Sequence, residues 1–393
     1  MADAALPRLL YIADVPVEAS LHGSALIFRL LETYPAGRLR IVETGVPSQA
    51  TRRLPGVTYA SMPIGRQRWL NTRLHGVYSA WLTWRAASRA NRVIASTAGF
   101  EVGAVATVGH GFGWLTAAEV ARRLGVPLHL IVHDDWPQLS GIAGVARPWL
   151  DRSFGAVYRA AASRLCVSPF MAEEYARRYH ASGSVMYPSR SKDCPIFEAK
   201  TPRAIRNGEI VIGYGGSSGP EMMACLRTLA AALTGAPTRL EVFGPFGEDA
   251  KRDLLSISPA ISFQGFVPFD QMIRDLRAIA DVLFLPMTFD AAGRNNMTVS
   301  FPSKFTDYTA TGLPLLIYGP PYSSAVRWAR SFDDVAEIVD RESVDALREA
   351  IARIAADHDR RAALAGRAVA IGRQCFDPEG ARAALAAALG GVG

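Results

Sequence analysis

The chain has 393 residues, of which 49% are hydrophobic and 20% are charged, so it is long enough for two domains and too apolar to be disordered throughout. It shows no apolar run long enough for a transmembrane helix and no signal-peptide pattern. The four cysteines form no CxxC pair, which argues against a cysteine zinc site or a disulfide framework and favours a reducing cytoplasm.

The formal net charge of +7 comes mainly from arginine. An Arg/Trp-rich region at 38–92 holds ten arginines against the single acid Glu43, with Trp69, Trp81 and Trp84 between them. A GC-rich genome that favours arginine codons is the alternative explanation. If the pattern reflects function, it suits an anionic partner. Because the sequence shows no RNA-binding or helix-turn-helix pattern, an anionic membrane surface is favoured over nucleic acid.

The first half of the chain alternates short apolar runs with amphipathic stretches, which predicts a parallel, doubly wound sheet. The expected strands and helices, in chain order, are a strand at 8–15, a helix at 24–34, strands at 38–45 and 102–111, a helix at 114–125, strands at 127–137 and 163–168, and a helix at 169–180.

The pattern breaks at a polar, proline-containing stretch at 186–208 and then starts again. We expect strands at 209–216, 238–245, 261–268, 281–287 and 314–321, helices at 220–233 and 270–280, and further helices near the C-terminus. The predicted organisation is an N-terminal domain at 1–190, a linker at 191–208, a C-terminal domain at 209–375 and a C-terminal helix at 376–393, with packing of that helix on the N-terminal domain as one option.

The stretch "FPSKFTDYTATGLPLLIYG" predicts a short helix with Ser303 as its N-cap and Gly312 just past its end. A helix N-terminus beside Lys304 suits a diphosphate, because free N–H groups and a full positive charge meet there. The carboxylate of Asp307 suits two vicinal ribose hydroxyls. The alternative is that Asp307 only offsets the helix dipole and that Lys304 is solvated.

This stretch resembles the C-terminal domain of the two-domain (GT-B) glycosyltransferases, closest to glycosyltransferase family 4. The likeness spans about 205–330 and is weaker over 8–190. It implies two doubly wound Rossmann-like domains facing across a cleft, a nucleotide-diphosphate-sugar donor, retention of anomeric configuration and no metal. In this resemblance, Asp307 binds the ribose, and Ser303 and Lys304 bind the phosphates. The matching residues are Pro302, Ser303, Lys304, Asp307, Tyr308, Ala310, Gly312 and Pro314.

The sequence also departs from that family. Val299 stands where many relatives carry a second acid, and Asp307 replaces the more frequent glutamate. The stretch "YGGSSGPE" lacks the usual cation pair. We expect the backbone N–H groups of this glycine loop to cradle a phosphate and the missing charge to come from Lys304 or Arg294. The loop residues concerned are Gly215, Gly216 and Ser217.

In the N-terminal half, His22 and Gly23 lie between a strand and a helix, where relatives use a glycine loop; an ordinary turn is the alternative. His133 and Asp134 follow a strand directly. By resemblance His133 contacts the donor sugar, and His110 is a second candidate. Three adjacent residues from His133 onward cannot all face one ion, so no metal site is predicted there.

The leading hypothesis is a bacterial, cytoplasmic glycosyltransferase of polysaccharide biosynthesis, peripheral at the inner face of the membrane, with a glycan or lipid-linked acceptor. The catalytic candidates are His133, Lys304 and Asp307, and the acceptor or sugar-side candidates are His22, Gly23, His110 and Asp134. Two alternatives stay open: a sugar-nucleotide epimerase or hydrolase on the same scaffold, and a non-catalytic protein that binds a nucleotide-sugar or a partner.

Overall fold

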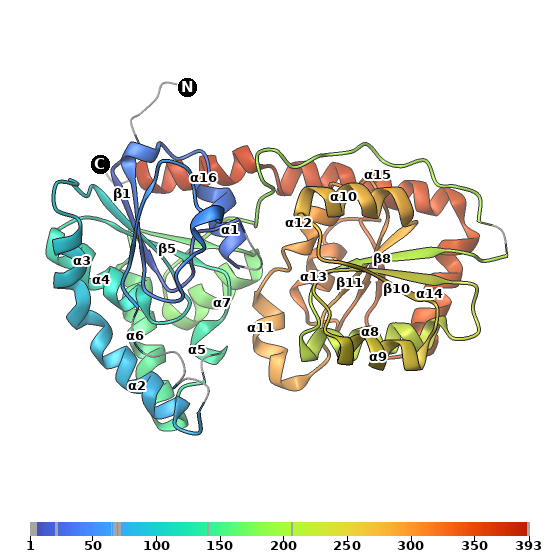
Figure 1. The fold of residues 1–393 in the computed structure, drawn as a ribbon, viewed down its shortest axis with the longest axis horizontal. Coiled ribbons are helices and arrows are strands. Elements are labelled where there is room, and N and C mark those ends of the chain that lie inside the picture. The colour runs from blue at the N-terminus through green and yellow to red at the C-terminus, as the bar shows by residue number, and fades with distance from the viewer. Residues whose placement is uncertain are drawn as a thin grey trace. The chain divides into compact units, whose positions relative to one another are not determined.

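The structure is a computed structural model that describes residues 6–19, 23–63, 65, 69, 72–139, 141–205 and 207–390. The predicted site residue His22 lies outside these residues. The chain divides into two compact units (Figure 1). The first unit comprises Met1–Lys192, Val299–Phe301 and Pro378–Gly393, and the second comprises Asp193–Thr298 and Pro302–Asp377.

The first unit is built on a parallel sheet with strand order β3-β2-β1-β4-β5-β6-β7 among the described residues. The strands are β1 Leu9–Ala13, β2 Leu39–Glu43, β3 Thr58–Ser61, β4 Ala104–Val108, β5 Leu128–Val132, β6 Ser163–Cys166 and β7 Ser184–Val185. Every residue of β1, β4 and β5 is buried, as expected for parallel strands covered on both faces.

Helices cover both faces of this sheet. Leu9 and Tyr11 of β1 join a core cluster with α1 and α16, whereas Leu10 and Ile12 join a second cluster with α3 and α4. This alternation follows from the two-residue period of a strand. The helices are α1 Gly23–Leu31, α2 His75–Ala86, α3 Ala90–Ser96, α4 Gly113–Leu124, α5 Trp136–Leu139, α6 Arg147–Ala160, α7 Pro169–Tyr179 and α16 Pro378–Gly390.

The second unit repeats the architecture with strand order β10-β9-β8-β11-β12-β13 among the described residues. Its strands are β8 Val211–Gly215, β9 Arg239–Phe243, β10 Ile261–Gly265, β11 Val282–Pro286, β12 Leu315–Tyr318 and β13 Glu337–Val339. The helices from this half of the chain are α8 Pro220–Leu233, α9 Glu248–Ile257, α10 Phe269–Ile279, α11 Arg294–Val299, α12 Lys304–Tyr308, α13 Ser324–Arg330, α14 Val344–Ala356 and α15 His358–Cys375.

The predicted fold class of two doubly wound parallel sheets is confirmed. Each expected strand is present, and α8 has the bounds expected from the sequence. The expectation that Gly312 lies just past the end of α12 is wrong, because α12 ends at Tyr308 and residues 309–312 form a turn in which Gly312 has a φ of +74°. The sequence analysis did not predict β3, β7 and β13. The residues of the edge strand β3 are all at least partly exposed, so it lacks an apolar run, and β7 and β13 are only two and three residues long.

The segment predicted as a linker is bound to the second unit over part of its length. The Phe197 N–H donates to the Ala310 carbonyl at 2.9 Å, and the Lys200 N–H donates to the Gly312 carbonyl at 2.8 Å. At the other end of the chain, α16 packs on α1 of the first unit, where Arg382 pairs with Glu32 at 2.8 Å. No helix among the described residues is long and apolar enough to cross a membrane.

Candidate functional site

Polar side chains gather at the carboxyl ends of the central strands of the first unit. Asp14 follows β1, His110 follows β4, and His133 follows β5, and these three strands are neighbours in the sheet. The strand order reverses between β1 and β4, and ligands of doubly wound sheets bind at such a reversal. This edge of the first sheet is therefore the place where a ligand is expected.

His110, His133 and Asp134 form one cluster. The Asp134 carboxylate oxygen Oδ2 lies 3.3 Å from His110 Nδ1 and 3.1 Å from His133 Nε2. Burial would raise the pKa of Asp134, but the two histidines outweigh burial and hold this pKa below its ordinary value. Gly23 belongs to the same group, because a Cβ at Gly23 would lie 3.3 Å from the His133 ring.

One ligand atom from each residue of this cluster lies within 4.8 Å of the others, close enough to share a metal ion. Two imidazoles and one carboxylate are a donor set that suits a divalent transition metal. In the structure, however, both imidazoles lie close to the same carboxylate oxygen, so the proximity of the three groups does not itself require an ion. The absence of a metal stays a prediction.

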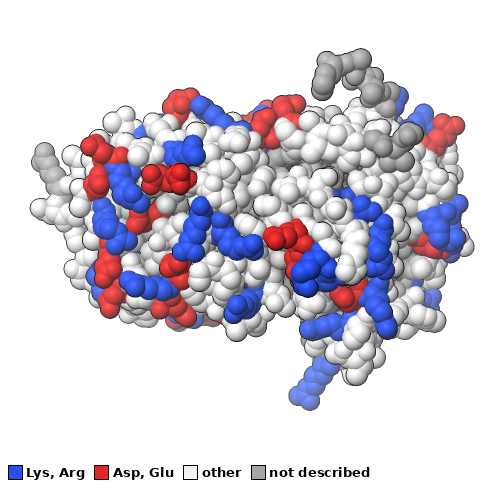
Figure 2. Space-filling model, turned by 180° about the vertical axis from the view of Figure 1, so that it is seen from behind, with Lys and Arg blue, Asp and Glu red and all other residues white. Residues whose placement is uncertain are grey.

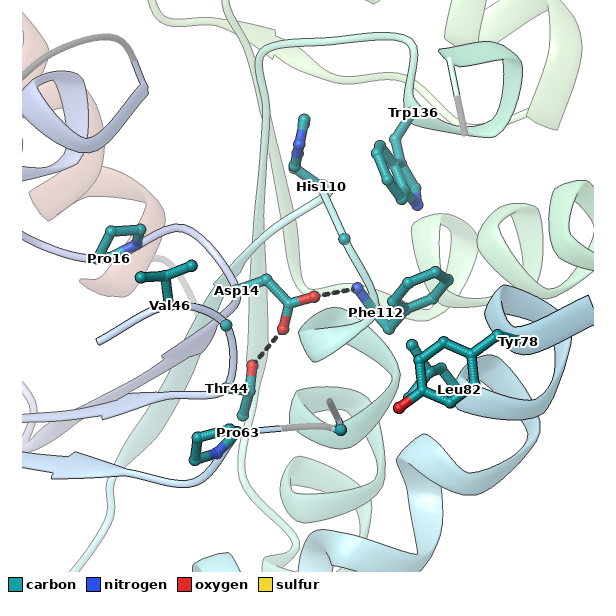
Figure 3. Close-up of a pocket in the computed structure, with 13 residues that line it drawn as sticks. Asp14, Pro16, Thr44, Val46, Pro63, Tyr78, Leu82, His110, Phe112 and Trp136 are labelled. Atoms are coloured by element: carbon teal, nitrogen blue, oxygen red, sulfur yellow. Dashed lines mark hydrogen bonds between the residues drawn. The ribbon is translucent and has the colours of Figure 1, made fainter. Parts of the chain in front are cut away.

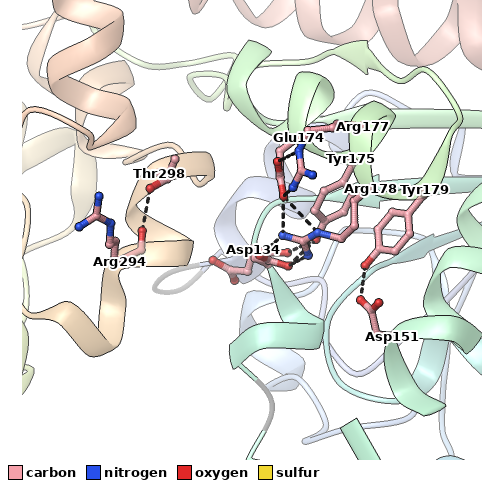
Figure 4. Close-up of polar contacts among 10 residues, drawn as sticks. Asp134, Asp151, Glu174, Tyr175, Arg177, Arg178, Tyr179, Arg294 and Thr298 are labelled. Carbon is pink, nitrogen blue, oxygen red and sulfur yellow. Dashed lines mark hydrogen bonds and ion pairs between the residues drawn. The ribbon is translucent and has the colours of Figure 1, made fainter. Parts of the chain in front are cut away.

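Asp135, the neighbour of Asp134, does not join this cluster and instead makes buried contacts with α7. Its carboxylate is fully buried and accepts two hydrogen bonds from Arg178, at 2.8 and 2.9 Å, and one from the Tyr175 hydroxyl at 3.1 Å. Figure 4 labels the side chains of Arg178 and Tyr175 that make these contacts. Adjacent residues point to opposite sides of an extended chain, so one acid reaches the histidines and the other reaches α7. Asp135 thus ties β5 to α7.

A cavity of about 260 Å³ lies beside this cluster, and all of its lining residues belong to the first unit. Asp14 lies in its wall between Thr44 and Phe112 (Figure 3). The Thr44 hydroxyl donates to the Asp14 carboxylate at 2.5 Å, and the Phe112 N–H donates to it at 2.6 Å. Sequence reasoning missed Asp14, because an acid at a strand end has no local signal that separates it from a turn residue.

In the second unit, the end of β8 meets α12. The Gly215 N–H donates to the Tyr308 hydroxyl at 2.8 Å, and the Gly216 N–H donates to the Phe243 carbonyl at 2.9 Å. Both N–H groups are therefore engaged within the unit, and the expectation that this glycine loop cradles a phosphate stays a prediction. The two glycines also allow close packing, because a Cβ on Gly216 would lie 2.9 Å from Lys304 Cε.

Lys304 and Asp307 lie in the same region on α12. Burial lowers the pKa of Lys304, and the charge of Asp307 offsets part of this effect. The Lys304 ammonium also lies 5.6 Å from the centre of the Tyr214 ring. Asp307 is only 7% exposed, and its carboxylate accepts a hydrogen bond from the Thr306 hydroxyl at 2.8 Å. A cation and an acid thus share a poorly solvated position next to the glycine turn.

The other residues predicted to bind the donor, Ser303, Ser217 and Arg294, also belong to the second unit. Ser303 precedes α12 with helical dihedral angles and makes no side-chain cap, so the predicted N-cap hydrogen bond is absent. The Phe305 and Thr306 N–H groups donate to Pro302 and Ser303 carbonyls, because the chain enters α12 through a tight turn. The Ser217 carbonyl accepts from the Tyr214 hydroxyl at 3.3 Å. The Arg294 guanidinium stacks on Tyr322 at 4.3 Å.

Gly244, which follows β9, packs so closely against the Gly216 turn that a side chain at position 244 would clash with it. Its φ is +133°, and a Cβ there would overlap the Gly216 carbonyl oxygen. We expect Gly244→Ala to lower the free energy of unfolding by about 1–3 kcal/mol, measured by urea denaturation. Gly247→Ala is the matched control, because no atom lies within 4 Å of its Cβ position. Equal stability of the two variants would contradict the prediction.

No family model and no curated protein matches the chain. Among solved structures, HepE of Anabaena in complex with UDP and glucose matches with a TM-score of 0.68 and 15% identity, over 98% of this chain and 99% of that chain. Sucrose-phosphate synthase of Thermosynechococcus elongatus matches with a TM-score of 0.67 and 14% identity, over 96% and 97%. The chain has the GT-B fold.

A third GT-B match is the lipopolysaccharide outer core galactosyltransferase WaaB, with a TM-score of 0.63 and 15% identity, over 97% of this chain and 98% of that chain. The predicted resemblance is thus confirmed for the fold. In this GT-B chain, the glycine turn, Lys304 and Asp307 belong to the second unit, and the histidine cluster and the Asp14 cavity belong to the first.

Proposed function

We propose that the protein is a glycosyltransferase that moves a sugar from a nucleotide-diphosphate-sugar to a hydroxyl of a glycan or lipid-linked acceptor, with retention of configuration. The observation that carries the proposal is the grouping of Lys304 and Asp307 beside the Gly215–Gly216 turn at the carboxyl end of β8. The GT-B fold supports it, since HepE was solved with UDP-glucose.

In this proposal Asp307 accepts hydrogen bonds from the ribose hydroxyls, and Lys304 neutralises the diphosphate. As the sugar–phosphate bond breaks, negative charge grows on the departing phosphate oxygen. A cation that is already in place and poorly solvated stabilises that charge without reorganisation. Gly216 leaves room for close approach because it has no side chain. Ser303, Ser217 and Arg294 are assigned to the donor side, and His133 to the transferred sugar.

Two measurements test this function. UDP, GDP, dTDP and ADP, each free and as the glucose conjugate, are screened for an increase in melting temperature, starting with UDP-glucose. The conjugate that stabilises the protein is then incubated with and without glycan acceptors, and released nucleotide diphosphate and sugar products are measured. We expect acceptor-stimulated release. Stabilisation without turnover on any acceptor would favour the non-catalytic alternative, and a changed sugar nucleotide without acceptor would indicate an epimerase.

We also propose that the protein binds a lipid surface and that the helix α2 makes this contact. Four large apolar side chains, spaced three or four residues apart, form one exposed face on and just before this helix. Their exposed fractions are 57% for Leu74, 66% for Val77, 43% for Trp81 and 70% for Trp84. The opposite face, including Leu82 and Ala86, is buried in the unit. An exposed apolar stripe of this kind suits an interface between water and lipid.

Arginines flank the exposed face of α2. Arg73 and Arg85 are exposed, and the Arg85 guanidinium lies 5.3 Å from the centre of the Trp81 ring. Basic side chains are visible at this end of the first unit, at lower right in Figure 2. Each cation near an anionic membrane contributes about 1 kcal/mol of attraction. The stripe and its arginines together therefore fit anionic lipid better than a neutral bilayer.

We expect Trp84→Ala to weaken binding to vesicles that contain phosphatidylglycerol about tenfold, the equivalent of about 1.4 kcal/mol, because a large aromatic side chain no longer enters the interface. Co-sedimentation measures the effect. Val185→Ala is the control, since Val185 is an exposed apolar residue of the same unit that lies on β7, the edge strand of the sheet. Unchanged binding by Trp84→Ala, or equal binding to neutral vesicles, would contradict a role for α2.

A further inference from the structure

The cavity beside Asp14 has a mixed lining that the proposed donor site does not use. Its wall combines apolar side chains with a few polar groups at one edge of the sheet (Figure 3). Its volume of about 260 Å³ is near the lower end of small-molecule pockets, so it has room for a single ring rather than a nucleotide. The side chains that matter most for recognition are Asp14, His110, Tyr78, Phe112 and Trp136.

Three glycines from two segments, Gly45 after β2 and Gly111 and Gly113 between β4 and the start of α4, close around Asp14. A Cβ at Gly45 would overlap the Asp14 carbonyl oxygen, and a Cβ at Gly111 would overlap its carboxylate. A Cβ at Gly113 would lie 2.9 Å from the Asp14 amide nitrogen. Gly111 also has a φ of +69°, which favours glycine on its own account. The fold therefore holds this carboxylate in a fixed position.

The buried position of Asp14 disfavours the charged form of its carboxyl group. Burial raises the pKa of Asp14, and the hydrogen bonds from Thr44 and Phe112 offset this only in part. Each carboxylate oxygen can accept more than one hydrogen bond, and in the structure Oδ1 accepts one from Thr44 and Oδ2 accepts one from Phe112. Asp14 thus retains capacity to accept from a ligand hydroxyl.

Trp136 supplies the complementary group. Its indole N–H is buried and has no hydrogen-bond partner among the described residues. A buried donor without a partner is unusual in a folded protein and indicates a missing acceptor. The Trp136 ring lies 4.5 Å from the His110 ring and 5.8 Å from the Phe112 ring, measured between centroids. The cavity therefore offers an acceptor, a donor and an aromatic wall.

We propose that this cavity binds one uncharged, hydroxyl-bearing ring of monosaccharide size, with its hydroxyl groups on Asp14 and its apolar C–H face against the aromatic wall. Because a hydroxyl both donates and accepts, separate hydroxyls of one ring can donate to Asp14 and accept from the Trp136 N–H. This inference rests on the proposed function, because the bound ring is taken to be the acceptor sugar of the glycosyltransferase. Asp14 and Trp136 then determine which acceptors enter.

The charges around the cavity argue against other ligand classes. A phosphate or carboxylate group would face the Asp14 carboxylate at close range. A cation would be attracted by Asp14 but would also meet the field of Arg89 and His110, both of which act on Asp14. An uncharged ring avoids both penalties.

Saturation-transfer NMR on the full chain, without nucleotide, tests the site. The probes are glucose, galactose, mannose and N-acetylglucosamine as neutral rings, glucuronate and glucose 6-phosphate as anions, and glucosamine as a cation. We expect at least one neutral sugar to bind at least tenfold more tightly than its charged analogue. Asp14→Asn is expected to weaken that binding at least tenfold, and Trp136→Phe several-fold, because the ring stays while the N–H is lost.

Val46→Trp and Asp151→Asn complete the set. Val46 lines the cavity and is 54% exposed, so a larger side chain there blocks the cavity without disturbing the core and is expected to abolish binding. Asp151→Asn is the matched control, because Asp151 accepts from the Tyr179 hydroxyl outside the cavity. Binding of no neutral sugar, preference for a charged ring, or binding unaffected by Asp14→Asn and Val46→Trp would each overturn the proposal.

The result is separable from that of the donor site. Asp14 and Asp307 belong to different units, and nucleotide binding is measured without sugar. If a nucleotide stabilises the protein while no neutral sugar binds, the cavity proposal fails and the glycosyltransferase proposal stands. If a sugar binds and no nucleotide does, the cavity stands and the transferase proposal fails.

Discussion

Replacing Asp307 with alanine is expected to abolish the stabilisation that the matching nucleotide gives the wild-type protein. At a hundredfold excess over the dissociation constant, a bound ligand adds about 2.7 kcal/mol to the free energy of unfolding. Hydrogen bonds to a charged acceptor contribute about 1.5–3 kcal/mol each. Loss of two ribose contacts therefore weakens binding at least a hundredfold, and the increase in melting temperature falls to near zero.

Two further variants show whether this loss is specific. Asp307→Glu keeps the charge and lengthens the side chain by one methylene, toward the residue more frequent in the resembled family, so it is expected to retain part of the affinity. Asp345→Ala removes an exposed acid that pairs with Arg348 on α14 and should leave the nucleotide response unchanged. Each variant is compared with its own ligand-free melting temperature. A full response by Asp307→Ala would remove this residue from the donor site.

Replacing Asp135 with alanine is expected to lower the free energy of unfolding by about 2–3 kcal/mol. The substitution removes the carboxylate that receives two N–H groups of Arg178, while Arg178 keeps its ion pair with Glu174 at 3.0 Å. The Tyr175 hydroxyl loses the same acceptor. Chemical denaturation monitored by circular dichroism measures this change.

A surface pair provides the comparison for Asp135. Asp249 pairs with Arg252 one helical turn away on α9, and both side chains are largely exposed. Asp249→Ala is therefore expected to cost less than about 1 kcal/mol. The buried substitution should exceed the exposed one several-fold. Similar losses in the two variants would mean that the Asp135 contacts contribute little to stability.

The elements that could be predicted from the sequence are those with a local signal. The apolar runs of β1, β4 and β8 indicate buried strands, and Gly125 marks the end of α4, where its φ is +66°. The candidate residues His110, His133 and Asp134 were also found, because each follows a strand. Both histidines lie close to one carboxylate oxygen of Asp134 because β4 and β5 are neighbours in the sheet. Local sequence patterns do not encode this order of strands.

Asp14 illustrates what a single sequence hides. The side chains and glycines that hold it come from loops about 30 and about 100 residues further along the chain. Asp134 and Asp135 make the same point, since they are adjacent in sequence and have different environments. The engaged N–H groups of Gly215 and Gly216 were unpredictable for a similar reason: their partners, Tyr308 and Phe243, lie far along the chain.

The two sides of the helix α2 connect the Asp14 cavity with the proposed lipid-binding face. Tyr78 and Leu82 on one side of it line the Asp14 cavity, while Val77 and Trp84 on the other side are exposed. Tyr78 stacks on Trp81 at 5.5 Å between ring centroids, so the two sides are in direct contact. By linkage, if occupation of the cavity changes the affinity of α2 for lipid by some factor, lipid must change the affinity of the cavity by the same factor.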